Sequence, residues 1–265
     1  MMLAVKQTTD YAEEPSECIA QHAKVLVVCT DDGRFKMSNG KIFSSGNHPV
    51  ETLLPLLHLK TAGFSFEFAT ISGGPVVLEM WAFPNKDKAV SDLYQELKPS
   101  LDAPTALDQV NASLKGYAAI YLPGGHGAMV NLPESVALGK LLHAAHAAAL
   151  PTIALCHGPA ALLAASKVDG AGFPYDGYTA VSFSDKTDKL TPKLGYLPGR
   201  MPWFQQEALA AQGMVMLNKA ETGAVNIDRE LVTGDSPKAA QKLGVVAVTM
   251  AIAALSRPQN DSAVR

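Results

Sequence analysis

Short apolar runs alternate with helix-forming segments along most of this chain, and this alternation constrains the fold more than any other feature. Continuous apolar runs of about four to eight residues are typical of strands that are buried on both faces. We expect such strands over residues 24–29, 64–71, 117–122, 152–155, 178–183, 214–217 and 230–233. Helical spacing or Ala/Leu-rich composition predicts helices over residues 48–62, 133–150, 158–166, 202–212 and 236–255. This order predicts an α/β fold, with a mostly parallel sheet and helices on both faces.

The alternation also suggests how the chain is divided. Residues 1–22 precede the first strand and are expected to form an exposed N-terminal arm, followed by one α/β domain over residues 23–265. Residues 73–115 interrupt the alternation with a Gly-Gly-Pro sequence and a polar stretch, and we interpret them as an inserted cap with short helices of its own. The arm carries four acidic residues and no apolar segment, so it is not expected to be a signal peptide.

Composition and charge exclude several classes of function. The net charge is −3, which predicts neither a nucleic-acid-binding nor a membrane-binding surface. We see no apolar run near the length of about 18 residues that a membrane span requires. The three cysteines lie far apart and form no CxxC pair, which argues against disulfides or a zinc cluster and favours the cytoplasm.

Cys156 lies between the run 152–155 and the helix that Gly158 and Pro159 begin. A strand that turns sharply into a helix lifts the turn residue clear of the sheet, as in a nucleophile elbow. The helix N-terminus should favour negative charge, so we expect the thiolate to form more easily than in solution. The alternative is an inert cysteine buried on a core strand; the Cys-His-Gly-Pro junction favours the reactive interpretation.

A glycine-rich loop at residues 123–127 follows another predicted strand. Ligands of open α/β sheets bind at the carboxyl ends of strands. Backbone amides of Gly124 and Gly125, with the amide of His157, are therefore candidates for an oxyanion hole. The alternative is a tight turn that needs glycine for its conformation.

Two carboxylates are weaker candidates. Glu51, two residues after Pro49, fits an ordinary helix start as well as a general acid or base beside Cys156. Asp188 follows the predicted strand 178–183 in a polar loop. It could orient His157 as the third member of a triad, but alone it resembles any loop carboxylate.

Six motifs, in this order, resemble the HchA-type branch of the DJ-1/PfpI superfamily, which comprises glyoxalase III / protein deglycases and heat-shock chaperones. They are Gly46-Asn-His-Pro-Val-Glu-Thr-Leu-Leu-Pro55, Ala69-Thr-Ile-Ser-Gly73, Pro123-Gly-Gly-His-Gly127, Leu155-Cys-His-Gly-Pro-Ala160, Gly195-Tyr-Leu-Pro-Gly199 and Thr233-Gly-Asp-Ser-Pro237.

The resemblance implies a flavodoxin-like core with a small cap, a homodimer and no cofactor. It implies Cys156 as nucleophile, Glu51 as its carboxyl partner, and His157 with Asp188 as the rest of the triad. The activities it implies are glutathione-independent conversion of methylglyoxal to lactate, deglycation, and holding of unfolded clients. Partners would be small 2-oxoaldehydes and glycated or unfolded proteins, and nucleic acid only as a glycated substrate.

Some relatives carry a metal site made of two histidines and a carboxylate. The corresponding positions here are Lys60, Ser65 and Leu97, none of which is a usual zinc ligand, so we expect no metal at that site. Two rival functions remain open at this point. One is a cysteine peptidase or amidotransferase-like hydrolase, and the other is a holding chaperone without catalysis.

Overall fold

The computed structural model describes residues 6–14 and 23–256, which are built around a seven-stranded sheet of order β10-β11-β7-β6-β1-β4-β5. The pairs are parallel except for β10 with β11. The inner strands β4-β1-β6-β7-β11 have the order of a flavodoxin-like sheet, so the predicted fold class is confirmed. The strands of this sheet are β1 (Lys24–Val28), β4 (Ser65–Thr70), β5 (Thr105–Ala106), β6 (Tyr117–Leu122), β7 (Thr152–Leu155), β10 (Val225–Asp228) and β11 (Leu231–Gly234).

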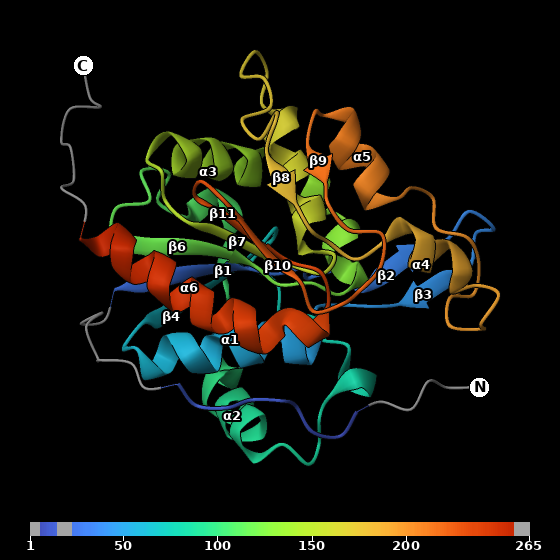
Figure 1. Ribbon diagram of the computed structural model, residues 1–265, viewed down its shortest axis with the longest axis horizontal. Helices are drawn as coiled ribbons and strands as arrows, with labels where there is room; N and C mark the ends of the chain where they lie inside the picture. The colour runs from blue at the N-terminus through green and yellow to red at the C-terminus, as the bar shows by residue number, and fades with distance from the viewer. Residues whose placement is uncertain (1–5, 15–22, 257–265) are drawn as a thin grey trace.

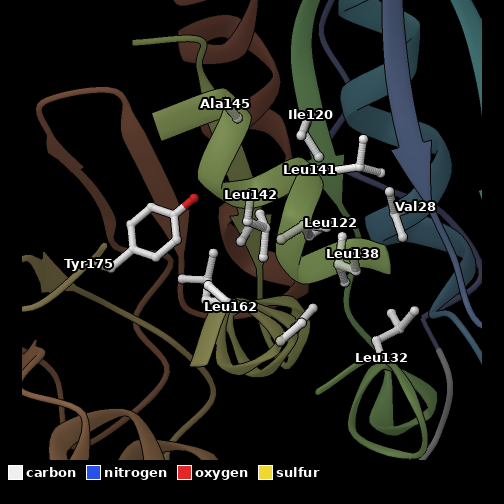
Figure 2. Packing of buried hydrophobic residues seen from close by; sticks show 14 of the residues in the cluster. Val28, Ile120, Leu122, Leu132, Leu138, Leu141, Leu142, Ala145, Leu162 and Tyr175 are labelled. Atoms are coloured by element: carbon white, nitrogen blue, oxygen red, sulfur yellow. The ribbon is translucent and has the colours of Figure 1, made fainter. Parts of the chain in front are cut away.

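Helices cover both faces of the sheet (Figure 1). On one face, α1 (Pro49–Thr61) packs beside α6 (Ala240–Leu255), and α2 (Lys88–Asp102) lies outside α1. On the other face are α3 (Val136–Ala147) and the 3₁₀ helix η5 (Gly158–Lys167). Figure 2 shows leucines of α3 meeting Ile120 and Leu122 of β6 and Leu162 of η5. Burial of these apolar side chains fixes the sheet edge at which β6 and β7 end.

Several elements differ from the sequence-based expectations. A hairpin of β2 (Arg34–Lys36) and β3 (Ile42–Ser44) lies in a region expected to be loop, and β10 was also not predicted. The strands β8 (Thr179–Ala180) and β9 (Val215–Met216) form a separate two-stranded sheet. The expected loop after residue 183 contains the helix α4 (Asp185–Leu190), and the next helix is α5 (Gln205–Ala211). The short 3₁₀ helices are η1 (Met80–Ala82), η2 (Leu107–Gln109), η3 (His126–Met129), η4 (Leu132–Glu134) and η6 (Pro237–Ala239).

Residues 73–115 are more closely joined to the main fold than a cap of short helices would be. The helix α2 is 15 residues long, and β5 pairs with β4 at the edge of the central sheet. A strand of two residues such as β5 forms only by pairing with a neighbouring strand that local sequence does not specify. The division of the chain into arm, domain and cap stays a prediction, and residues 1–5, 15–22 and 257–265 lie outside the described residues.

The stretch Pro237–Leu255 is long and apolar enough to cross a membrane by length and composition alone. The expectation that no run reaches that length was therefore wrong. Within this stretch, Leu243, Ala247 and Ala251 are buried in the core that α1 and α6 share. A helix that contributes to the core of a globular domain passes the same length test, and this packing favours that interpretation.

Candidate active site

Cys156 follows β7 directly and has a φ of +61°, a conformation that is rare outside glycine. Three hydrogen bonds hold the turn: the Cys156 amide donates to the Gly234 carbonyl (2.8 Å), and its carbonyl accepts from the Phe183 amide (2.8 Å) and from Gln205 Nε2 (3.1 Å). Surrounding structure can maintain strained backbone of this kind at functional sites. The structure thus shows the sharp strand-to-helix turn that the sequence predicts.

Glu51 lies in the first turn of α1, and its side chain is buried beside the Cys156 thiol. No described nitrogen or oxygen donates to either carboxyl oxygen, so the residue does not serve as an ordinary solvated helix-start carboxylate. Burial, and secondarily the charges of Glu79 and Asp235, raise the pKa of Glu51 well above its usual value. A carboxyl group in this environment is suited to hold and exchange a proton at neutral pH.

The expectation of an easily formed thiolate needs correction. Burial raises the pKa of the Cys156 thiol well above its usual value, and the Glu51 carboxylate raises it further. The Gly125 amide lowers it, but with a smaller effect. Because two adjacent negative charges are costly in a buried site, the pair retains a proton that either group can carry. Formation of the thiolate therefore depends on transfer of its proton to Glu51. The N-terminus of the short 3₁₀ helix η5 is not sufficient to ionise the thiol.

His157 connects the thiol to Asp188. Its Nδ1 lies 3.4 Å from Cys156 Sγ, and its Nε2 donates to Asp188 Oδ2 at 2.9 Å. The ring stacks on Phe183, with 4.7 Å between the ring centroids. Asp188 lies on α4 and not in a loop, and its side chain is buried. Burial acts to raise the pKa of Asp188, but interactions with His157 and His126 outweigh burial and lower this pKa. The carboxylate is therefore ionised.

The glycine loop lies directly against the thiol. Gly125 has a φ of +99°, and its amide interacts with the Cys156 sulfur. Gly124 lies between Glu51 and Cys156, where a Cβ atom would overlap the Glu51 carboxyl and lie 2.7 Å from Cys156 Cβ. Only glycine lets the loop pack this closely against its neighbours at both positions. The Gly125 amide is thereby placed where it can stabilise an oxyanion formed next to the sulfur.

Gly124→Ala should lose most activity and destabilise the protein by about 1–3 kcal/mol, because the added methyl group must displace Glu51 or the backbone. Gly170→Ala is the control, since its Cβ would meet nothing within 4 Å and only its φ of +72° is strained. Chemical denaturation and turnover should be measured for both variants. Equal effects of the two substitutions would contradict this role of Gly124.

A cavity of about 430 Å³ opens onto these residues and reaches Cys156. Its walls include the apolar side chains of Val50, Trp81, Phe183 and Tyr196. Residues 6 and 8–10 of the N-terminal arm also line it, and Thr9 is held by hydrogen bonds to Asp87 at the start of α2. The thiol is thus enclosed but reachable, as a nucleophile for a small carbonyl compound requires.

The sequence interpretation missed three groups beside the triad: the half-buried His48 and the buried Glu79 and His126. His126 was visible as the only non-glycine in the Gly-Gly-His-Gly motif after a strand. His48 lies in the first motif, three residues before Glu51, whereas Glu79 carries no signal of its own because the tertiary fold brings it to the cavity. Burial and the charges of His126 and His157 lower the pKa of His48 to about 4, so this imidazole is neutral at pH 7.

Two places in the described structure bear on metal binding. His126, His157 and Asp188 are the three potential ligands that lie close together within the described part of the chain. Their approach is explained by hydrogen bonds of both imidazoles to the carboxylate, so we assign them to proton handling. At the positions that the family resemblance assigns to a metal site, Lys60 pairs with Glu96 and Leu97 packs against the core. The expectation of no metal there stays a prediction.

Comparison with known proteins finds similarity along most of the chain. The model of the DJ-1/PfpI family matches residues 17–181. The chain is 45% identical to the protein/nucleic acid deglycase HchA of Escherichia coli (strain K12 / DH10B), over 92% of this chain and 86% of that protein. The same identity and coverage hold for the protein/nucleic acid deglycase 1 of Escherichia coli (strain K12).

Solved structures show the same fold at lower sequence identity. The rapid encystment protein of Francisella tularensis is 21% identical with a TM-score of 0.73, and glyoxalase III from Candida albicans is 18% identical with a TM-score of 0.68. Each comparison covers 86% of this chain and 98% of the other.

Proposed function

The chain belongs to the DJ-1/PfpI family, and from that membership and the site geometry we propose that it is a glutathione-independent glyoxalase and protein deglycase. The observation that carries this proposal is the buried carboxyl group of Glu51 beside the Cys156 thiol. A carboxyl group at this place can take the thiol proton and later move a proton between neighbouring substrate carbons. In the proposed isomerisation that second transfer is the chemically demanding step.

The reaction would begin when Glu51 accepts the thiol proton and the Cys156 sulfur attacks the aldehyde carbon of methylglyoxal. The oxyanion is stabilised by the Gly125 amide and takes the proton back from Glu51, which gives a hemithioacetal and restores the Glu51 carboxylate. Glu51 then removes the hydrogen from that carbon and returns a proton to the neighbouring one, while the hydroxyl proton moves to the neighbouring oxygen, which gives a lactoyl thioester. His157 activates the water that hydrolyses the thioester, and lactate leaves as the thiol is restored.

A deglycase reaction would use the same thiol on a hemithioacetal or hemiaminal already attached to a protein. The E. coli relatives are named for action on proteins and nucleic acids, which supports glycated macromolecules as substrates here. The cavity of about 430 Å³ leaves space for part of an attached side chain beside the reacting carbon. A homodimer and a cytoplasmic location remain part of the proposal.

The proposed activity is tested by supplying methylglyoxal to the purified protein in the absence of glutathione and following lactate by an enzymatic or chromatographic assay. We expect turnover that added glutathione does not increase. Strict dependence on glutathione, or release of ammonia from glutamine or cleavage of peptides in place of lactate, would favour the rival hydrolases. In those enzymes a histidine distant in sequence acts on the thiol, whereas His157 is adjacent to Cys156.

Exposed apolar side chains near the cavity favour a second activity, the holding of unfolded clients. Met80, Trp81 and Leu194 are 49%, 38% and 62% exposed, and the latter two line the cavity. Exposed apolar groups of this kind bind unfolded polypeptide. Suppression of client aggregation should therefore survive Cys156→Ala unchanged, since holding needs no thiol.

A further inference from the structure

His126 shares a carboxylate with the proposed catalytic histidine. Its Nε2 lies 3.1 Å from Asp188 Oδ1, while His157 Nε2 lies 2.9 Å from Asp188 Oδ2. The two imidazole rings are 4.0 Å apart between centroids. All three side chains are buried, so water screens their charges little. One carboxylate thus serves two imidazoles, of which the proposed chemistry uses one.

A second carboxyl group faces His126 from the segment before η1. Glu79 is 2% exposed, accepts the backbone N–H of His126, and also accepts the Ser45 hydroxyl at 2.9 Å. Burial raises the pKa of Glu79 to about 7, so it is partly ionised at neutral pH. His126 therefore lies between two acidic groups, Glu79 and Asp188.

The remaining neighbours of His126 supply little negative charge. His48, from the start of α1, is neutral at pH 7 and faces the same space. Phe35, Phe43, Phe183 and Tyr196 contact the ring from four other segments. Aromatic side chains exclude water, which strengthens the effect of the two carboxyl groups and the repulsion between the two histidines.

We propose that His126 is a positioning residue that carries the positive charge paired with Asp188 and thereby keeps His157 neutral, ready to accept a proton. Two imidazolium ions at this separation would repel each other strongly, so the Asp188 carboxylate stabilises one of them at a time. His126 is the one with a second acidic neighbour, Glu79, and His157 is the one whose other nitrogen faces the thiol. The role of a neutral His157 in catalysis rests on the proposed function. The assignment of the positive charge to His126 does not depend on that function.

Electrostatic effects on the two rings agree with this assignment. Burial opposes protonation of His126, but its interactions with Asp188 and Glu79 outweigh burial and raise the pKa of His126. Burial and the charge of His126 lower the pKa of His157, and together they outweigh Asp188 and Glu221, which raise it. Removing the His126 charge should therefore raise the pKa of His157, which would then be protonated and inactive over a wider range at low pH.

His126→Gln tests the proposal through the pH dependence of methylglyoxal turnover. We expect the acid limb of the pH–rate profile to move to higher pH by about one unit, with activity largely recovered on the alkaline side. His143→Gln is the matched control, because His143 lies on α3 and bonds only the Ala165 carbonyl among the contacts the structure shows. A uniform loss at every pH with an unmoved acid limb would indicate a merely structural role and would overturn the proposal.

Nitrogen-15 NMR of the histidine rings in the wild-type protein provides a test that needs neither a folded variant nor turnover. At pH 7 we expect both ring nitrogens of His126 to be protonated and His157 to hold a single ring proton. A neutral His126 would refute the proposal even if lactate is formed. If the protein fails to convert 2-oxoaldehydes but His126 is cationic, the proposed function fails and the charge assignment stands.

Discussion

Cys156→Ala should abolish methylglyoxal turnover, with a loss of roughly 10⁴-fold or more, because no other described nucleophile replaces the sulfur that forms the covalent intermediate. The thiol is held at the end of β7 in a strained turn, with Glu51, His157 and the Gly125 amide around it. Alanine removes the reacting atom and little else, so the fold should persist. Lactate formation under saturating substrate measures the effect.

Cys29→Ala is the matched control for this substitution. Cys29 is completely buried directly after β1, where burial raises the pKa of its thiol far above the ordinary value. It lies in the apolar core, and its replacement should cost stability of about 1 kcal/mol while leaving turnover intact. Retained turnover in Cys156→Ala, or equal loss in both variants, would contradict the assignment of Cys156 as nucleophile.

Glu51→Gln should lower turnover by about 10²- to 10⁴-fold, since an amide cannot take the thiol proton or shuttle hydrogen between substrate carbons. Gln is close in size and shape, so the cavity and α1 should be unchanged. The pKa of Glu51 is raised in the folded protein, so the folded state binds its proton more tightly than the unfolded chain. This contribution favours folding at low pH and is lost as pH rises toward the folded-state pKa. Gln does not ionise and should therefore be at least as stable at pH 8.

Glu67→Gln serves as the control, because Glu67 lies on β4 and pairs with Lys24 away from the cavity. Chemical denaturation at pH 5 and pH 8 should accompany the rate measurements. Loss of turnover together with unchanged or increased stability separates a catalytic role from a structural one. Turnover of Glu51→Gln within tenfold of wild type would exclude Glu51 as the proton carrier.

The strands that form the middle of the sheet were predictable because their apolar runs are continuous and flanked by turn residues. Residues 117–122 and 152–155 were predicted with the bounds that β6 and β7 have. The short strands β2, β3, β5 and β10 were missed, since two to four residues carry too little periodicity and depend on their pairing partners. The helix α4 was missed for a similar reason: five of its six residues are polar, and they lie within a segment rich in turn-forming residues.

Cys156 and His157 were recognisable from local sequence because the strand, the turn and the helix are contiguous. Glu51 and Asp188 were ambiguous from spacing alone, and only the resemblance to a known family favoured them. The charge state of the thiol was predicted wrongly, because it depends on how deeply folding buries the sulfur and on a carboxylate 105 positions away in sequence. Glu79 is likewise placed beside His126 by the tertiary fold.

The central claim, that Cys156 attacks the substrate and Glu51 carries the proton afterwards, is tested most directly by native mass spectrometry of Glu51→Gln with methylglyoxal. Without the neighbouring carboxylate the pKa of Cys156 is lower than in wild type, and His157 Nδ1, 3.4 Å from the sulfur, can take the thiol proton in place of Glu51. Slow attack therefore continues while the following proton transfer between the substrate carbons stops. We predict one methylglyoxal adduct that accumulates and maps to the Cys156 peptide, and that is absent from the Glu51→Gln/Cys156→Ala double variant. An adduct that maps elsewhere, or that forms equally in the double variant, would contradict the account.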